Sequence, residues 1–347
     1  MALLTDGDPE ARRRLDALPT AGLGHWPTPL HRLDRFSAAV GAEVWAKRDD
    51  VQGVALAGNK VRKFDLVVGQ ALADGCDTLV TTGAAQSNSA RTGASAAAAV
   101  GMESVLLLSG DAPAEPSGNL VLDHLVGGDV RWAGDVGLRE LNEGVEQIVT
   151  DLGAAGRRAF AAPLGCSSPL GTLGFAKAFC EAEAQWTAAG IEPSAIVHAS
   201  TSGGTHAGLL VGRSIVGSAT RLIAVDVGAF NAEPHGLLAL ARKAAALVGH
   251  DLALEPGEVE VTTDQIGTGY GHHTPEATAA INTLARTEAV VTDPVYSGKG
   301  VAGLLALVAS GAIDATPERP VVFWHTGGYH ALFDPAHGVR HLAGPTE

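Results

Sequence analysis

Short apolar runs alternate with longer alanine-rich segments along almost the whole chain. The run 104–108 (Ser-Val-Leu-Leu-Leu) is almost wholly apolar, and such runs are typical of strands buried on both faces of a sheet. This alternation predicts an α/β fold in which helices cover both faces of parallel sheets. We expect strands at 43–47, 78–82, 104–108, 130–132, 158–162, 195–199, 222–227 and 321–324, and helices at 59–73, 89–100 and 174–189.

The chain has 347 residues, which is long enough for two domains with separate cores. We expect a smaller α/β domain at 61–173, inserted into a larger domain formed by 1–60 and 174–347. Proline and glycine content predicts loops at 113–118 and 228–234.

The stretch 202–208 (Ser-Gly-Gly-Thr-His-Ala-Gly) stands between the expected strand at 195–199 and a helix-like run at 209–211. In parallel α/β sheets, ligands bind beyond the carboxyl ends of the strands. Small residues there let the backbone approach a ligand, and unpaired N–H groups at a helix N-terminus favour an anion. The stretch therefore predicts a phosphate-binding loop, with a purely structural glycine turn as the alternative.

A second cluster, 58–63 (Gly-Asn-Lys-Val-Arg-Lys), places lysines beside a flexible turn. Lys60 is the candidate amine nucleophile, although a lone lysine is more often a surface residue. A phosphate-binding loop and a nucleophilic amine together indicate a cofactor with a phosphate at one end and an aldehyde at the other. The local positive charge fits either a small anionic ligand or a solvated face. It comes from Lys47, Arg48, Lys60, Arg62 and Lys63.

Charge and composition exclude several other classes of protein. The formal net charge of −14 opposes a general affinity for nucleic acid. Three cysteines without a CxxC pair, and His272-His273 without companion ligands, give no expectation of a metal site. The stretches 203–208 and 297–300 lack the spacing of dinucleotide and Walker A motifs. No signal-peptide pattern or membrane-spanning run is recognisable, so we expect a cytoplasmic protein without a membrane partner.

Polar residues also follow the expected strand at 78–82. The stretch 85–89 (Ala-Gln-Ser-Asn-Ser) lies where this strand ends and a helix begins. Its side chains either cap that helix or hold a carboxylate and a ring hydroxyl. Tyr296 lies in the turn-like stretch 293–299, where a packed aromatic is the alternative to a site residue.

These motifs resemble those of the fold-type II pyridoxal-phosphate enzymes, and within them the branch of 1-aminocyclopropane-1-carboxylate (ACC) deaminase and D-cysteine desulfhydrase. The resemblance runs from about Trp26 to Phe333. It implies a two-domain, three-layer αβα fold of the tryptophan synthase β type, and pyridoxal 5′-phosphate as the cofactor. The motifs that carry it are 47–50, 58–63, 86–88, 203–208, 293–296 and 325–328.

The resemblance also implies roles for individual residues. Lys60 would bind the cofactor aldehyde covalently with Asn59 beside it, and Asn88 would hydrogen-bond the ring hydroxyl. Thr326 would face the pyridine nitrogen. The phosphate would be held by Thr201, Ser202, Gly203, Gly204 and Thr205. The substrate would be bound by Gln86, Ser87, Asn88, Tyr270 and Tyr296. The expected catalytic residues are Lys60, Tyr296 and Ser87, with the α-proton assigned to either Lys60 or Tyr296.

Two positions bear on the reaction within this branch. In the deaminase pattern a glutamate follows the active-site tyrosine and a leucine stands in the His-x-Gly-Gly motif, whereas this chain has Ser297 and Thr326. A hydroxyl at the pyridine nitrogen leaves the cofactor a weaker electron sink than a carboxylate would. A weak sink suffices when a good leaving group departs from the β-carbon. We therefore predict a D-cysteine desulfhydrase that forms pyruvate, ammonia and sulfide.

Other functions stay open at this point. His272, His273 and His330 follow family motifs, and if they reach the site they favour a more anionic leaving group, as in an L-cysteate sulfo-lyase. ACC deaminase is a further alternative. A non-catalytic module that binds a phosphate ligand is the alternative from another class. The resemblance implies a homodimer that acts on a small amino acid.

Overall fold

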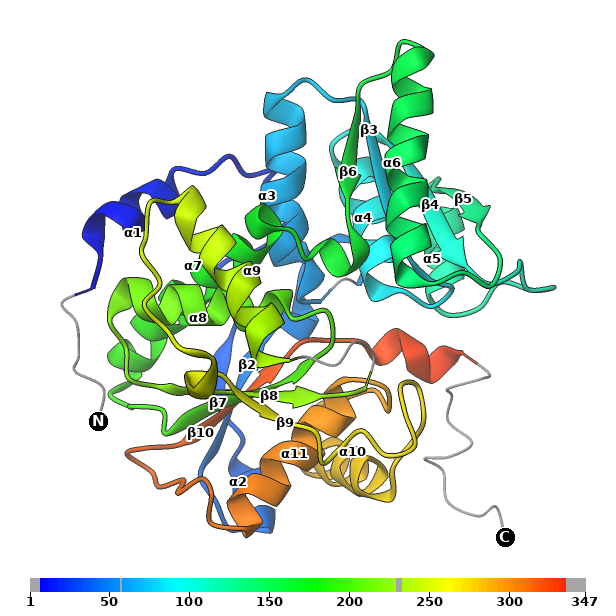
Figure 1. The fold of residues 1–347 in the computed structure, drawn as a ribbon. Helices are drawn as coiled ribbons and strands as arrows, with labels where there is room; N and C mark the ends of the chain where they lie inside the picture. The colour runs from blue at the N-terminus through cyan, green and yellow to red at the C-terminus, as the bar shows by residue number, and fades with distance from the viewer. Residues whose placement is uncertain (1–6, 57, 229–232, 335–347) are drawn as a thin grey trace, which may run out of the picture.

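Two parallel sheets, one in each lobe, form the framework of the protein (Figure 1). The computed structural model describes residues 7–56, 58–228 and 233–334. The larger sheet has six strands in the order β1-β2-β10-β7-β8-β9, and the smaller has four in the order β5-β4-β3-β6. All neighbouring strands run parallel except β1, which pairs with β2 in the antiparallel sense.

The larger lobe has helices on both faces of its sheet because side chains alternate along each buried strand. In β7, Ile196 packs with one hydrophobic cluster, whereas Ala195 and Val197 pack with the other. The first cluster includes residues of α1, α7, α8 and α9, and the second residues of α2, α10 and α11. The elements of this lobe are α1 (Pro9–Asp16), β1 (Leu30–Arg32), α2 (Asp34–Val40), β2 (Val44–Arg48), α7 (Pro169–Ala189), β7 (Ala195–Ser200), α8 (Gly204–Val216), β8 (Arg221–Asp226), α9 (Pro234–Leu247), β9 (Glu260–Thr262), α10 (Pro275–Glu288), α11 (Ser297–Ala309) and β10 (Val321–His325).

The smaller lobe repeats this layering around β3 and β4. Helix α3 joins the two lobes, since it packs against both α4 and α7 (Figure 1). The elements here are α3 (Lys60–Ala73), β3 (Thr78–Ala84), α4 (Asn88–Ala99), β4 (Glu103–Ser109), α5 (Asn119–Leu125), β5 (Asp129–Trp132), α6 (Leu138–Ala154) and β6 (Ala159–Ala162). Short 3-10 helices lie at Asp49–Val51, Val54–Leu56, Leu164–Cys166, Pro256–Glu258 and Tyr329–Phe333.

The predicted α/β fold with parallel sheets is confirmed, and every strand expected from the sequence is present. The segment 113–118 contains no helix or strand, as predicted. The loop predicted at 228–234 ends earlier, because Pro234 begins α9, and 229–232 lie outside the described residues. The predicted domain limits at 61 and 173 fall within α3 and α7, so they stay a prediction.

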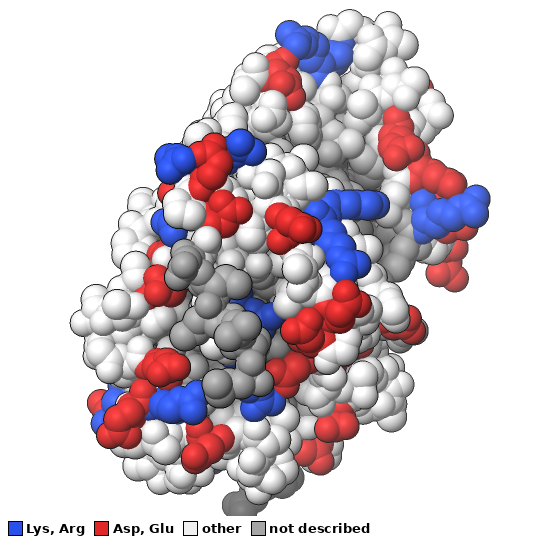
Figure 2. Space-filling view, turned by 60° about the vertical axis from the view of Figure 1, so that its left-hand side comes forward, with Lys and Arg blue, Asp and Glu red and all other residues white. Residues whose placement is uncertain are grey.

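Acidic and basic side chains are interspersed on the face shown in Figure 2, and neither sign forms a continuous stripe there. This mixture gives no support to a nucleic-acid surface on that face. Within the described part of the chain, no helix is both long and apolar enough to cross a membrane.

Candidate active site

A cavity of about 330 Å³ opens where the carboxyl ends of β3, β7 and β10 come together. Most of the site residues predicted from the sequence line it, although they come from six separate segments of the chain. Those that line it are Asn59, Lys60, Ser87, Asn88, Thr201, Ser202, Gly203, Thr205, Tyr270, Tyr296 and Thr326. Gln86 and Gly204 are not in the lining. Sequence reasoning did not assign Ser89, Ser109, Val136, Leu141, Leu164 and Ser200, which also line it.

The loop between β7 and α8 has the geometry of an anion-binding site. Gly203 has a φ of 77°, a left-handed conformation that a residue without Cβ adopts readily. A Cβ added at Gly204 would lie 2.5 Å from Nζ of Lys63 and 2.6 Å from Oγ of Ser167, so only glycine leaves this space open. The first N–H groups of α8 have no partner within the helix and favour a negative charge here.

Lys63 places a buried amine beside this loop, a role that the sequence analysis did not assign. Its side chain is buried, and Nζ donates to Oγ of Ser167 (2.9 Å) and to the carbonyl oxygen of Gly165 (3.1 Å). Oγ of Ser167 is in turn 2.7 Å from Oγ of Ser202. Burial, and then the nearby charge of Lys60, lower the pKa of Lys63 to about 7. An anion in the loop would favour its charged form.

Lys60 lies at the first position of α3, beside this loop. Its Nζ donates to Oδ1 of Asn59 (3.3 Å), and Nδ2 of Asn59 donates to Oγ1 of Thr205 (3.2 Å). The backbone N–H of Asn59 donates to the carbonyl oxygen of Thr326 (3.1 Å). Burial lowers the pKa of Lys60 to about 8, and the positive charge of Arg91 acts in the same direction. A substantial fraction of the amine is therefore neutral, and thus nucleophilic, near physiological pH.

The N-terminus of α4 forms the opposite wall. Oγ of Ser87 accepts the hydrogen bond from the N–H of Ala90 (3.1 Å), so Ser87 caps helix α4, as one of the two alternatives predicted. Ser87 also lines the cavity. Asn119, which is buried, donates through Nδ2 to Oδ1 of Asn88 (3.0 Å) and to the carbonyl oxygen of Gln86 (2.9 Å). Sequence reasoning missed Asn119 because it lies 31 residues from Asn88.

Gln86 does not point into the cavity as its predicted contact with substrate required. Its side-chain amide donates to the carbonyl oxygen of Ser117 (3.0 Å), and Oε1 accepts the N–H of Asn119 (2.8 Å). The amide is thus used to hold the loop before α5. This placement gives Gln86 a part in shaping the Ser87–Asn88 turn, and its contact with a substrate stays a prediction.

Tyr270 and Tyr296 meet at the third side of the cavity, where their hydroxyl groups are hydrogen-bonded and their ring centroids lie 5.9 Å apart. The carboxylate of Asp293 accepts the N–H of Tyr296 (2.8 Å) and the hydroxyl of Ser297 (2.6 Å). Desolvation and the neighbouring Tyr270 raise the pKa of Tyr296 well above its usual value. Tyr296 is therefore a protonated phenol at neutral pH.

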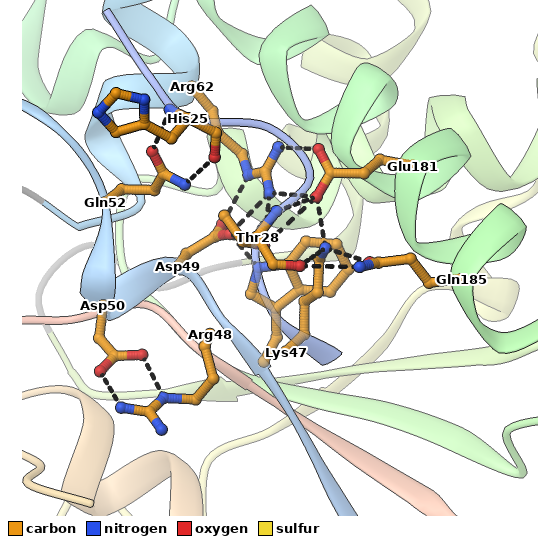
Figure 3. A network of polar contacts seen from close by, with 11 residues as sticks. His25, Thr28, Lys47, Arg48, Asp49, Asp50, Gln52, Arg62, Glu181 and Gln185 are labelled. Carbon is orange, nitrogen blue, oxygen red and sulfur yellow. Dashed lines mark hydrogen bonds and ion pairs between the residues drawn. The ribbon is translucent and has the colours of Figure 1, made fainter. Parts of the chain in front are cut away.

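The charged motif at 47–50 does not contact the cavity. Lys47 and Asp49 are fully buried and join Arg62 and Glu181 in one network (Figure 3). Arg62 donates to Oδ1 and Oδ2 of Asp49 (2.7 and 2.8 Å). Burial would raise the pKa of Glu181, but Arg62 and Lys47 outweigh it and lower that pKa to about 2. Lys47 and Arg62 are buried, so the alternative that these positive charges lie on a solvated face is wrong for them.

The three histidines that favoured an anionic leaving group are not in the cavity lining. His330 is buried and stacks on the ring of Tyr329, with centroids 4.6 Å apart. Among the described residues that line the cavity, Lys60 alone has a charged side chain. No group of three His, Cys, Asp or Glu residues in the described ranges is placed to hold a metal ion.

The site suits a cofactor that carries a phosphate and an aldehyde. The loop at 201–205, whose glycines leave room that a Cβ would fill, would hold the phosphate, with Lys63 behind it. The amine of Lys60 lies beside that loop and would hold the aldehyde. Fold and site together fit the class of enzymes that bind a phosphorylated cofactor.

Comparison with known proteins identifies the family. The chain belongs to the family described as pyridoxal-phosphate dependent enzymes, whose pattern matches residues 22–327. It is 36% identical to the D-cysteine desulfhydrase of Yersinia enterocolitica, over 93% of this chain and 97% of that protein. It is 37% identical to the 1-aminocyclopropane-1-carboxylate deaminase of Methylobacterium sp. (strain 4-46), over 90% of this chain and 96% of that protein.

A solved structure titled as an ACC deaminase homologue superimposes with a TM-score of 0.85, at 35% identity, over 94% of this chain and 96% of that one. The predictions of a fold-type II pyridoxal-phosphate enzyme, of the cofactor and of lyase or deaminase chemistry are thus confirmed. The roles of single residues stay predictions.

Proposed function

We propose that the protein eliminates the β-substituent of a small amino acid, with D-cysteine as the substrate and pyruvate, ammonia and hydrogen sulfide as products. The observation that carries this proposal is Thr326, which lines the cavity together with Lys60 and whose backbone is tied to Asn59. A hydroxyl at this place supports a weaker electron sink than a carboxylate would, which suits the loss of a good leaving group. One relative bears the name of this activity.

The cofactor, when bound, supplies an aldehyde for the substrate amine and an electron sink for the charge that develops at the α-carbon. The N-terminus of α4, with Ser87 and Asn88, would bind the substrate carboxylate, since unpaired N–H groups and hydroxyl donors favour an anion. The side chain of Thr326 would face the pyridine nitrogen.

Lys60 is the better base for the α-proton. Its pKa is lowered to about 8, so a neutral amine is available near neutral pH. The raised pKa of Tyr296 keeps that hydroxyl protonated, which suits it to donate a hydrogen bond. As the proton moves from the α-carbon to Nζ of Lys60, the electrons of the C–H bond form a Cα–Cβ double bond, the C–S bond breaks, and its electron pair leaves with sulfur. Water then hydrolyses the released enamine to pyruvate and ammonia.

A second candidate is ACC deaminase, because a relative of 37% identity bears that name. The position of Ser297 argues against it: the hydroxyl of Ser297 donates to Asp293 and the residue does not line the cavity. No acidic side chain is among the described lining residues to take the place of the glutamate in the deaminase pattern. The described lining residues likewise include no histidine for the sulfonate of L-cysteate.

The experiment that tests this proposal is a panel of amino acids given to the purified, cofactor-loaded enzyme. D-cysteine should release sulfide and pyruvate in equal amounts, well above L-cysteine, L-cysteate, D-serine and ACC. Faster release of 2-oxobutyrate from ACC would establish the deaminase instead. A protein that stays colourless with pyridoxal phosphate and turns over none of them would be a binding module.

We also propose a homodimer located in the cytoplasm, on the strength of the family resemblance. Analytical ultracentrifugation of the cofactor-loaded protein should give twice the chain mass. A single chain mass at micromolar concentration would contradict the dimer.

A further inference from the structure

Lys299 is a buried lysine to which neither the predicted roles nor the proposed reaction gives a task. It lies in the first turn of α11, three residues after Tyr296, and its side chain is fully buried. Its Nζ donates to the carbonyl oxygens of Ile266 (2.8 Å) and Gly269 (3.3 Å). Both carbonyls belong to the loop that leads to Tyr270.

The loop needs hydrogen bonds of this kind because its glycines let the backbone adopt many conformations. Gly267, Gly269 and Gly271 have φ angles of 68°, 144° and 79°. Glycines in this region lose much conformational freedom when they are fixed in one place. The bonds from Ile266 N–H to the carbonyl of Thr263 (3.1 Å) and from His272 N–H to the carbonyl of Gly269 (3.4 Å) form turns within this segment and do not tie it to another element.

The charge around Lys299 links it to Tyr296. A buried ammonium group is costly unless it is paired, and the negative charges of Asp226 and Asp293 oppose the effect of burial on Lys299. Asp293 also accepts the N–H of Tyr296 (2.8 Å). One group of buried charges therefore holds both tyrosine-bearing segments.

We propose that Lys299 is a positioning residue that ties the Tyr270 loop to α11, so that the hydroxyl of Tyr270 meets the hydroxyl of Tyr296 at the cavity. A methionine at 299 has a similar length but no donor, and it leaves the two loop carbonyls without this partner. Tyr270 then loses its fixed place, while Lys60 and the phosphate loop stay as they are. The expected effect on turnover rests on the proposed function, whereas the hydrogen bonds of Lys299 to the loop do not depend on it.

The first test therefore measures the loop and requires no turnover. Amide hydrogen exchange of the full, cofactor-loaded protein is followed by mass spectrometry in wild type and Lys299→Met. Exchange in the peptide that covers 264–272 should become at least about tenfold faster, while β10 keeps its protection. The exposed Lys243→Met serves as the control and should change neither region. Unchanged exchange at 264–272 would overturn the proposal.

The second test separates positioning from a general structural role through a double-mutant cycle with Tyr270→Phe. Lys299→Met should lower kcat/KM about 10- to 100-fold in wild type, since misplacing a catalytic contact costs this much. In the Tyr270→Phe background the same change should cost less than about threefold, because the hydroxyl it positions is already gone. Equal losses in both backgrounds would overturn the proposal.

The absorbance of the bound cofactor is measured for each variant. It should stay at the wild-type level in Lys299→Met, and its loss would show that Lys299 acts on the whole fold instead. If Lys299→Met does not fold, Lys299→Leu, which also lacks a donor, takes its place in the cycle under the same criteria. Should the amino-acid panel reveal another substrate, the cycle is run with that substrate, and the exchange result stands independently.

Discussion

At the scale of the residue, the acid–base behaviour of Lys60 is governed by burial. Lysine in water has a pKa of about 10.4, whereas desolvation in the cavity wall lowers the pKa of Lys60 to about 8. The charged form is the one that burial disfavours, so the neutral amine appears at a lower pH than in a surface lysine. This makes the residue reactive without a separate base next to it.

The lowered pKa predicts how the apoprotein recaptures its cofactor. Only the neutral amine attacks an aldehyde, so the rate of colour formation with pyridoxal phosphate should rise with pH and level off just above pH 8. Stopped-flow absorbance over a series of pH values measures it. The Lys60→Ala variant, which lacks the amine, is the control and should show no such phase. A rate that keeps rising beyond about pH 10 would mean an ordinary lysine.

At the scale of the element, the β7–α8 unit shows why a phosphate-binding loop can be recognised from the sequence. An apolar strand, small residues and a helix follow one another directly, and their geometry depends on neighbours in the chain. The structure places Gly203 at the N-cap of α8 with a left-handed backbone, as such a loop requires. The same helix ends at Gly217, which is also left-handed, with a φ of 71°.

These two glycines provide a pair of variants matched in backbone conformation. Gly203→Ala and Gly217→Ala each place a Cβ in a left-handed conformation, which costs about 1–2 kcal/mol of stability. The Cβ at position 203 would also lie 2.3 Å from Cδ2 of Leu237, so the Leu237 side chain must shift in that variant. Only Gly203 lines the cavity, so only Gly203→Ala should weaken pyridoxal phosphate binding, by at least about tenfold. Fluorescence titration of the apoproteins measures the affinity. Equal affinities of the two variants would mean that this loop does not hold the phosphate.

The apolar inner strands were predictable from the sequence, whereas the two edge strands of the larger sheet were not. The strands β7 and β10 are apolar enough to be found in the sequence, whereas β1 and β9 have three residues each and are only partly buried. Strands this short carry little periodicity, and they owe their form largely to the neighbour with which they pair. The edge strands of the larger sheet were therefore missed, whereas β5 and β6 at the edges of the smaller sheet were predicted.

At the scale of the whole molecule, a buried network explains the charges of Lys47, Asp49 and Arg62 better than a ligand does. Arg62, two residues after Lys60, reaches Asp49 and Glu181, and Nε1 of Trp324 donates to Asp49 (2.8 Å) (Figure 3). The guanidinium of Arg62 also lies 4.2 Å from the ring centroid of Trp26. The network thus fastens the start of α3 to β2, α7 and β10.

Removing one member of this network should be costly. Asp49→Ala takes away one of the two carboxylates that accept from the buried Arg62 guanidinium, and it leaves the indole N–H of Trp324 without its acceptor, so we expect a loss of about 3–5 kcal/mol in the free energy of unfolding. Glu143→Ala, which breaks an exposed ion pair with Arg139, is the matched control and should cost at most about 1 kcal/mol. Urea denaturation measures both. A loss below about 1 kcal/mol for Asp49→Ala would contradict the structural role of the network.

The limit of prediction at this scale is the distance along the chain between partners. Glu181 lies 119 residues from Arg62, and Asn119 lies 31 residues from Asn88. Neither pairing leaves a local sequence pattern, because the two side chains become buried hydrogen-bond partners only after the lobes have folded. The sequence motifs named Lys60, Asn88 and Tyr296 correctly as cavity residues, but not the residues that hold them there.

The measurement that tests the central claim most directly is reductive trapping of the cofactor. The yellow, cofactor-loaded protein is treated with borohydride and digested, and the modified peptide is identified by mass spectrometry. A pyridoxyl phosphate group on Lys60 is the predicted result, with Lys60→Ala remaining unmodified. Modification of Lys63, whose amine lies behind the same loop with a lowered pKa, or no covalent modification at all, would contradict the account.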